Sequence, residues 1–311
     1  KVQTSAGKIE VNHGHLLLDK SEDFSISSFM QQQMCYIGQQ QVFEEASETF
    51  MKLTGVSVSA KQIERVCHHY GGLLEEEQKQ AITDGGKDKS VQIKGRHYAM
   101  VDGGMVLTRE EKWKEMKLAR IFKADEVINI SKGRRYIADS QYAAHLGGHN
   151  NFFEKVEYHL DAIADKVFIA DGAKWIWKWA DAKYPGSIQI LDFYHAKEHL
   201  CQFAQAVIAD EAQRKSWIKQ QADNLLDDGI EKVISQVKNM NVKTHLGRRI
   251  KKLLVAYYQT NSCRMLYKTY RHAGLLIGSG EMEAAHRHVI QHRMKLSGQR
   301  WSIKGAQKMA N

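Results

Sequence analysis

The chain has 311 residues, 43% of them hydrophobic and 26% charged, which is the composition of a globular protein large enough to bury an extensive core. Its formal charge of +9 favours polyanionic partners, and nucleic acid above all. No apolar run reaches the roughly 20 residues that span a membrane, and the four cysteines form no C-x-x-C pair, so we expect no membrane contact, no zinc finger and a cytoplasmic location.

Residues 1–90 are expected to form an N-terminal helical region. Between residues 28 and 53, apolar side chains recur at the spacing of an amphipathic helix, with a break near Gly38. Gly55 comes directly after this pattern, at a position where a glycine commonly ends a helix.

A second helix is expected from Ser59, which stands three residues before Gln62 in the spacing of a capping box, and a third over residues 73–82. The first two helices and the short segment between them fit a helix-turn-helix that enters a DNA groove. A helical hairpin that packs on the main domain fits them at least as well. Residues 84–90, rich in Gly and Asp, are the best linker candidate.

Residues 91–139 change character, because short apolar runs broken by glycines and charges replace the helical spacing. Such runs are typical of consecutive antiparallel strands joined by tight turns. Asp102 is expected to end the first strand, just before two glycines. An aspartate before glycines usually marks only a turn. Asp102 becomes a stronger candidate for a functional residue because Asp171, which is also followed by a glycine, repeats the pattern.

The sequence HLGGH holds two histidines, His145 and His149, with the spacing of metal ligands. The two glycines between them disfavour a rigid helix, so we expect both histidines in a loop. Residues 152–163 then show one apolar face, which predicts a helix packed on the core.

A strand–helix–strand pattern is the segment around which we expect the chain to be organised. Two β-rich runs, residues 167–170 and 188–191, are each followed by an aspartate, Asp171 and Asp192, and a helical pattern lies between them. Strand, helix and strand within about thirty residues predict a βαβ unit with parallel strands. Catalytic groups gather at the carboxyl ends of such strands, so both aspartates and His195 should face one crevice.

From residue 201 to residue 272 the sequence carries helical runs and no strand signal. A turn with three glycines, residues 274–280, then opens a helix whose start holds Glu281 and Glu283, where the helix dipole favours carboxylates. The body of this helix is rich in basic side chains suited to phosphates, namely Arg287, His288, His292, Arg293 and Lys295.

Asp102, Asp171 and Glu283 therefore stand at the ends of two expected strands and at the start of a late helix. Carboxylates without cysteine or paired histidine ligands suit hard ions such as Mg²⁺ or Mn²⁺. Two such ions about 3.5–4 Å apart can activate a water or a 3′-hydroxyl and stabilise the leaving oxygen in phosphodiester cleavage.

Four separated motifs occur in order: MVDGG around Asp102, IADGAKWIW around Asp171, LDFYHAKEHL with the D-x-x-H pair Asp192 and His195, and GLLIGSGEMEAAHRHVIQHRMKLSGQRWS around Glu283. Together they closely resemble bacterial insertion-sequence transposases of the DDE type and, more broadly, the Mutator-like groups. The resemblance covers residues 95–200 and 258–305 approximately.

The resemblance implies an α/β fold, an RNase H-like mixed sheet with flanking helices, preceded by the N-terminal helical region. The first part of this catalytic core would occupy residues 91–200, a helical insertion residues 201–272, and the rest of the core, with its Glu-bearing helix, residues 273–311. It also implies DNA as the partner, a homodimer or higher oligomer on that DNA, and a nucleoid-associated location in a bacterial cytoplasm.

The same resemblance implies that Asp102, Asp171 and Glu283 bind two Mg²⁺ or Mn²⁺ ions for strand cleavage and transfer at the ends of a mobile element. The family usually has an apolar residue at the position of Glu281, so which of the two glutamates binds metal is open. We choose Glu283 because the motif aligns there.

Further roles follow for other residues of the motifs. Asp192 and His195 would brace the site or contact the scissile phosphate. A final group would bind DNA, with Trp301 stacking on a flipped or unpaired base unless it is a core tryptophan; the group comprises Arg287, Arg293, Lys295 and Trp301.

Two other functions fit parts of the sequence. The segment from His195 to His199 spells H-x-x-E-H, the inverted zinc-peptidase motif, and on a helix its two histidines share a face. That alternative leaves Asp102, Asp171 and the glycine turn unexplained. The other is a DNA-binding protein derived from a transposase but without catalysis, against which the intact carboxylates argue.

Overall fold

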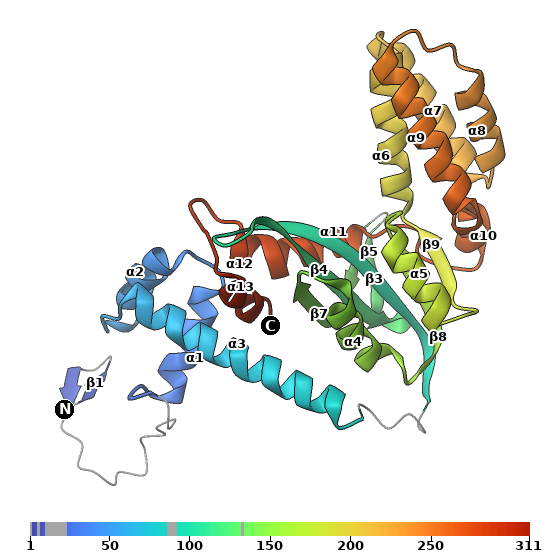
Figure 1. Ribbon diagram of the computed structural model, residues 1–311. Helices are drawn as coiled ribbons and strands as arrows, with labels where there is room; N and C mark the ends of the chain where they lie inside the picture. Colours follow the sequence, from blue (N-terminus) through green and yellow to red (C-terminus); the bar gives the residue numbers. More distant parts are fainter. Residues whose placement is uncertain (1, 5–6, 10–23, 86–91, 132–133) are drawn as a thin grey trace.

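The computed structural model of the chain describes residues 2–4, 7–9, 24–85, 92–131 and 134–311. It is a mixed α/β protein in which helices flank a five-stranded sheet (Figure 1). Helices of the N-terminal region lie at one end of the molecule, and a helical arm extends from the other. This arrangement is consistent with the expected RNase H-like fold.

The sheet has the strand order β7-β4-β3-β8-β9. Strand β4 pairs antiparallel with β3 and with β7, whereas β8 runs parallel to both β3 and β9. The expected antiparallel strands and the expected parallel βαβ unit are therefore both confirmed. The strands are β3 (Ile93–Thr108), β4 (Lys112–Lys123), β7 (Gln141–Leu146), β8 (Ile163–Ala170) and β9 (Ile188–Leu191).

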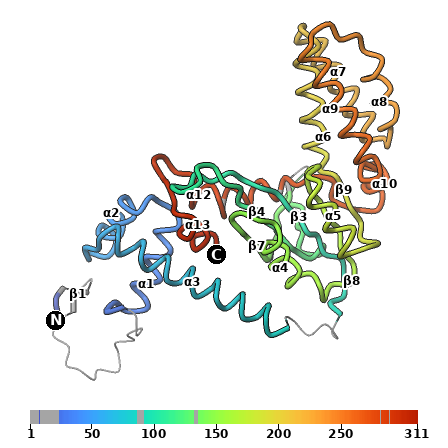
Figure 2. The backbone as a smooth tube through the Cα atoms, in the orientation of Figure 1, coloured from blue at the N-terminus to red at the C-terminus, as the bar shows by residue number. Residues whose placement is uncertain are grey.

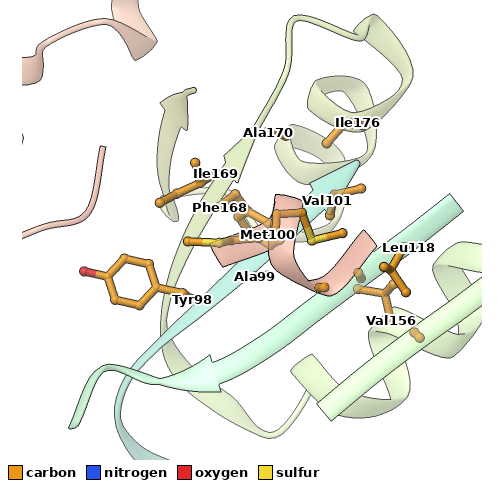
Figure 3. Close-up of a cluster of buried hydrophobic side chains, with 14 of the residues drawn as sticks. Tyr98, Ala99, Met100, Val101, Leu118, Val156, Phe168, Ile169, Ala170 and Ile176 are labelled. Carbon is orange, nitrogen blue, oxygen red and sulfur yellow. The ribbon is translucent and has the colours of Figure 1, made fainter. Parts of the chain in front are cut away.

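Helices α4 (His149–Leu160) and α5 (Lys174–Lys183) pack on the sheet through a core rich in aromatic rings. The rings of Phe153 and Trp179 stack with their centroids 4.4 Å apart, and Trp179 meets Phe168 of β8 edge-on at 5.5 Å. Figure 3 shows the buried side chains that β3, β8 and the two helices contribute to this core. Burying each such side chain contributes about 1.5–3 kcal/mol, which holds β3 and β8 firmly side by side.

Asp102 does not end a strand, so that expectation is wrong. Strand β3 continues through both glycines and stays paired with β4 as far as Thr108. The strand that ends at this level is β8. Because Val101 pairs with Ala170, the last residue of β8, Asp171 leaves the sheet directly beside Asp102.

The two histidines of HLGGH are not loop residues, which corrects a second expectation. His145 belongs to β7 and His149 begins α4, while the glycines between them connect strand to helix. The helix expected over residues 152–163 is α4, although Ile163 already belongs to β8.

Short elements complete the β structure. After β4, the 3₁₀-helix η1 (Ala124–Glu126) leads into a hairpin of β5 (Val127–Ser131) and β6 (Arg134–Ile137). At the N-terminus, β1 (Val2–Thr4) pairs with β2 (Gly7–Ile9).

The N-terminal helices begin and end where the sequence predicts. The break near Gly38 is confirmed, because α1 (Ser28–Gly38) is followed by a separate helix, α2 (Phe43–Thr54). Gly55 ends α2 in the left-handed conformation, with φ of 69°. Ser59 caps the next helix by accepting a hydrogen bond from the backbone N–H of Gln62 at 3.2 Å.

The expectation of a separate helix over residues 73–82 is wrong, because α3 (Ala60–Thr83) is a single helix. Gly71 faces α13 (Ile303–Ala310), and a Cβ atom placed on it would lie 1.9 Å from the carbonyl oxygen of Lys308. The glycine therefore allows two helices to approach closely and does not end one.

The N-terminal helices thus pack on the rest of the chain, as the hairpin alternative expects. Their entry into a DNA groove stays a prediction. Of the linker candidate, residues 84–90, all but the first two lie outside the described residues.

Residues 201–272, all of them described, form helices and contain no strand, as expected. These helices pack on one another in an arm that points away from the sheet (Figures 1 and 2). The expected boundary at residue 200 falls inside the first helix of the arm. The elements are α6 (Phe193–Val207), α7 (Glu211–Leu226), α8 (Ile230–Asn239), α9 (His245–Asn261), η2 (Ser262–Arg264) and α10 (Tyr267–His272).

The chain then returns to the sheet through a continuous helical stretch that follows the three-glycine turn. It comprises α11 (Gly280–Ala285), the π-helix η3 (His286–Gln291) and α12 (His292–Met294). Single π turns inside helices occur frequently at functional sites. Within the described part of the chain, no helix has the length and apolar character needed to cross a membrane.

Candidate active site

Two aspartates on neighbouring strands form the base of the candidate site. Asp102 lies in β3, and Asp171 directly follows the parallel strand β8. Helices α6 and α11 bring further predicted residues to a cavity of about 360 Å³ beside them. Five of the predicted site residues line this cavity: Asp102, Asp192, His195, Glu283 and Lys295.

Asp171 does not line the cavity, but its charge is coupled to that of Asp102. Its Oδ1 accepts a hydrogen bond from the backbone N–H of Ala173 at 2.9 Å. Burial raises the pKa of Asp171 above its ordinary value, and the nearby negative charges of Asp102 and Glu115 add to the rise against the opposing effect of the Ala173 N–H. Two carboxylates in this relation repel each other, and a divalent cation beside them would relieve that repulsion.

Asp192 ties two parts of the site together. Its Oδ1 accepts hydrogen bonds from the backbone N–H groups of Tyr194 at 2.6 Å and His195 at 3.1 Å, which caps α6. Its Oδ2 accepts bonds from the backbone N–H of Ser279, at 2.6 Å, and from the Ser279 hydroxyl. The side chain is 1% exposed. It therefore links the start of α6 to the turn before α11 from a buried position.

The pKa of Asp192 reflects these bonds. Burial alone would raise it, but the hydrogen bonds from His195 and Ser279 outweigh burial and hold the pKa below its ordinary value. Asp192 is therefore charged across the neutral range.

His195 adds a positive charge to the cavity. Its Nδ1 lies 3.8 Å from Oδ2 of Asp192. That carboxylate raises the pKa of His195 to about 9 against the opposing effect of burial, and the charges of Asp102 and Asp171 add to the rise. Because its side chain is 35% exposed, an imidazolium faces the cavity at neutral pH.

His286 is a site residue that the sequence reasoning missed. Its Nε2 lies 3.4 Å from Oδ2 of Asp102, and its side chain is 7% exposed. Burial lowers the pKa of His286, and Lys295 lowers it further, while the charge of Asp102 opposes the change. The sequence spacing could have identified it, because His286 lies three residues after Glu283 and so shares its helix face.

The glycines of the motifs allow side chains of other elements to press against the site. A Cβ atom placed on Gly104 would lie 3.1 Å from the His286 ring, and one on Gly172 would lie 2.1 Å from the ring of Tyr257 in α9. Tyr257, which the sequence reasoning also missed, brings the helical arm against the turn that follows β8. Burial raises the pKa of Tyr257, and the charge of Asp171 adds to the rise.

Glu283 is exposed and lines the cavity from α11. The side chain of Glu281 lies outside what the structure describes, so the choice between the two glutamates stays a prediction. Among the described residues, no group of three Asp, Glu, His or Cys side chains is close enough together to hold a metal ion. Asp102 and Glu283 thus line one cavity, Asp171 lies beside Asp102 outside its lining, and the three predicted ligands do not meet at metal-binding distance.

The basic residues predicted to bind DNA fall into two kinds. Arg287 and Lys295 are exposed, and Lys295 lines the cavity. Arg293 instead turns inward, where its guanidinium donates to the carbonyl oxygen of Met309 at 3.3 Å and burial lowers its pKa. Arg293 is thus partly buried and bonded between α12 and α13, and its contact with DNA stays a prediction.

Trp301 is a core tryptophan, so its predicted stacking on a base is wrong. Its side chain is buried, and its indole N–H donates to the carbonyl oxygen of Met294 at 3.1 Å. Phe43 of α2 packs edge-on against the indole at 5.8 Å. A buried ring with a satisfied N–H offers no surface to a nucleotide.

The H-x-x-E-H histidines have different partners in the fold. His195 faces Asp192, whereas the ring of His199 packs on Tyr257 with centroids 4.2 Å apart. Burial lowers the pKa of His199. A shared zinc ion would require the rings to leave these partners.

Comparison with known proteins places the chain in a family without assigning it an activity. A sequence comparison finds no curated protein that matches the chain. A family model does match, and it covers residues 16–311. The chain therefore belongs to the family described as "Uncharacterised protein family (UPF0236)".

Proposed function

We propose that this chain is a DDE-type DNA transposase, which cleaves and transfers DNA strands at the ends of a mobile element. In this proposal Asp102, Asp171 and Glu283 hold two Mg²⁺ or Mn²⁺ ions. One observation carries the proposal: Asp102 and Asp171 lie side by side on β3 and at the end of β8, and Asp102 shares a cavity with Glu283 of α11.

The donor set fits hard cations. Carboxylate oxygens are the preferred ligands of Mg²⁺ and Mn²⁺, and burial together with the negative charge of Asp102 raises the pKa of Asp171. Two ions bound here supply the activation of a water or 3′-hydroxyl and the stabilisation of the leaving oxygen. Glu283 is exposed on the first turns of its helix and lines the same cavity as Asp102, so its carboxylate is accessible as the third ligand.

The other residues of the cavity position a phosphodiester. The imidazolium of His195 and the ammonium of Lys295 both line it, and each can donate a charge-assisted hydrogen bond to a phosphate oxygen. Asp192 fixes His195 and the Ser279 turn relative to each other. We assign Asp192 as a positioning residue, because its two oxygens are already bonded to the protein.

The distribution of charge supports DNA as the partner. Residues 201–272 contain thirteen lysines and arginines and six acidic residues, so this segment alone carries +7 of the chain's +9. Arg248, Arg249 and Lys252 of α9 are all exposed. A basic arm beside an acidic cavity would hold the DNA backbone while the carboxylates act on one phosphate. An oligomer on DNA is part of the same proposal.

Asp171→Asn tests this function. It keeps the shape of the side chain but removes the charge. We therefore expect nicking of supercoiled plasmid in Mg²⁺ or Mn²⁺ to fall by at least about 100-fold. Losing a residue that only supports a metal ligand already lowers activity by up to about 100-fold. Non-specific DNA binding should persist, because it depends on basic side chains. Gel assays of nicking and fluorescence anisotropy of a labelled duplex measure the two.

The matched control is Asp165→Asn, in the same strand but paired with Arg96 at 2.9 Å; it should nick like the parent. Glu281→Gln and Glu283→Gln in the same assay identify the third ligand. Equal nicking by Asp171→Asn and the parent would refute the proposal. DNA binding by the parent without metal-dependent nicking would favour a DNA-binding protein without catalysis.

A further inference from the structure

A second, larger cavity of about 790 Å³ adjoins the acidic one. It lies among β6, the start of β7, the first turn of α6 and helix α11, and its size is typical of ligand sites, which span about 300–1,000 Å³. The two cavities share three lining residues, Tyr194, Gly280 and Glu283. A ligand in the larger cavity would therefore extend directly to Glu283.

The lining of this cavity combines aromatic faces with guanidinium groups. Three tyrosines line it and remain accessible: Tyr136 is 56%, Tyr142 39% and Tyr194 60% exposed. Arg120 and Arg135 line it as well. We call this the tyrosine groove.

Arg120 is a buried side chain of the groove whose position is fixed by its neighbours. The residue is 9% exposed, its Nε donates to the Ser140 hydroxyl at 2.9 Å, and its guanidinium lies 5.6 Å from the centre of the Tyr142 ring. Arg120 pairs with Met100 of β3, two residues before Asp102, so it projects from the same face of the sheet as that carboxylate. The groove and the acidic cavity therefore open on one face.

We propose that the tyrosine groove binds an unpaired segment of the DNA strand next to the bond that is cut, with its bases stacked on Tyr136, Tyr142 and Tyr194. This inference rests on the proposed function and adds the form of the substrate. Exposed aromatic rings bind bases of any sequence, because every base has a π-face. In a duplex those faces are covered by neighbouring base pairs, so the groove selects a single strand.

The charge of the lining favours a nucleic-acid strand over an apolar peptide. Arg120 and Arg135 lie among the tyrosines, where guanidinium groups attract phosphates and stack on bases. Because Glu283 belongs to both cavities, a strand in the groove would reach the acidic cavity.

Fluorescence anisotropy without divalent metal tests the groove, because binding is then measured without cleavage. The probes are a labelled oligothymidylate, a blunt duplex and the same duplex with an oligothymidylate tail. We expect Tyr136→Ala to weaken binding of the single strand and the tailed duplex by about 5- to 150-fold, the equivalent of removing the stacking of one base. Binding of the blunt duplex should stay unchanged.

Tyr136→Phe keeps the ring and should bind like the parent. The matched control is Tyr36→Ala, which removes an equally exposed tyrosine (59%) from α1, far from the groove in sequence. Unchanged single-strand binding by Tyr136→Ala and Tyr142→Ala, or an equal loss on the blunt duplex, would overturn the inference.

The nicking assay separates this failure from that of the proposed function. If the parent nicks DNA and Asp171→Asn does not, while the tyrosine variants bind like the parent, the groove is wrong and the function stands. If single-strand binding depends on the tyrosines but the parent never nicks DNA, the tyrosine groove is confirmed and the protein binds DNA without cleaving it. A parent that binds no DNA overturns both.

Discussion

Asp171 and Asp192 are both largely buried beside the same cavity, yet the pKa of Asp171 is raised and that of Asp192 is lowered. The difference lies in their donors. Asp192 accepts four hydrogen bonds, from Tyr194, His195 and twice from Ser279, and faces an imidazole. Asp171 accepts a bond from Ala173 and faces the like charge of Asp102. Hydrogen bonds therefore favour the charged form of Asp192, whereas burial and a neighbouring negative charge disfavour the charged form of Asp171.

The Asp192–His195 pair predicts a pH dependence of stability. The pKa of His195 in the folded protein is about 9, above its ordinary value of 6.5. The pair therefore contributes its full stability below pH 6.5 and loses that contribution as the pH rises through about 9. We expect the free energy of unfolding, measured with urea, to fall more steeply from pH 6.5 to pH 9 in the parent than in His195→Gln.

His199→Gln serves as the matched control for this measurement. Burial lowers the pKa of His199, so this side chain is neutral over the same pH interval. Its removal should leave the pH slope of the parent intact. Identical slopes for the parent and His195→Gln would contradict the assigned pair.

At the scale of elements, the position of helix α3 is set by its contact with α13. Gly71 touches the Lys308 backbone, and its carbonyl oxygen accepts a hydrogen bond from the Asn311 side chain at 3.2 Å. Gln307 of α13 in turn bonds to the backbone of β7 through Leu146 at 2.9 Å. These contacts connect the N-terminal helices to the sheet that carries the site.

Neighbouring glycines of α3 offer a paired test of this contact. Gly71→Ala should lower the free energy of unfolding by about 1–3 kcal/mol, the usual effect of overpacking, because its new Cβ meets backbone that cannot turn away. Gly72→Ala should be neutral or stabilising by up to about 1 kcal/mol, since its Cβ would lie 3.3 Å from the flexible end of Lys308 and alanine favours the helix. Urea denaturation measures both, and equal effects would show that the close approach is not required.

At the scale of the whole molecule, the excess positive charge and the acidic cavity lie in different parts of the chain. The arm holds most of the excess positive charge, whereas the acidic residues of the cavity lie at the sheet. Tyr257 of α9 joins the two parts, because it packs against Gly172 just after Asp171. Among the basic residues of α9, Lys251 is used internally, with its Nζ donating to the carbonyl oxygens of Lys238 and Met240 at 2.6 and 2.8 Å.

The exposed basic residues of α9 should therefore govern the salt dependence of DNA binding. Replacing Arg248, Arg249 and Lys252 together by Gln should flatten the slope of log affinity against log salt by about 0.9 for each DNA phosphate that these side chains neutralise. Anisotropy titrations of a labelled duplex over a range of NaCl concentrations measure this slope. A triple variant that removes the same charge from Lys94, Lys178 and Lys304, which are exposed outside the arm, should change it less. Equal slopes for the two triple variants would place the DNA elsewhere.

The sequence by itself determined the type and order of most elements and the candidate carboxylates. The βαβ unit, the helical arm, the break at Gly38 and the cap at Ser59 depend on patterns within a few residues, so local spacing was enough to predict them. The placement of Asp102 beside the end of β8 did not follow from the sequence, because β3 continues past Asp102 to Thr108 and its parallel pairing with β8 joins segments that are far apart in the chain.

Only the tertiary structure decided what the glycines and Trp301 do. Gly104 and Gly71 look like turn signals in the sequence, but each is small because a distant group, the His286 ring or the Lys308 backbone, packs against it. Trp301 is buried because Phe43 and the carbonyl of Met294 surround it. Such roles depend on partners far away in the chain, and neither hydrophobic periodicity nor spacing carries information about contacts at that range.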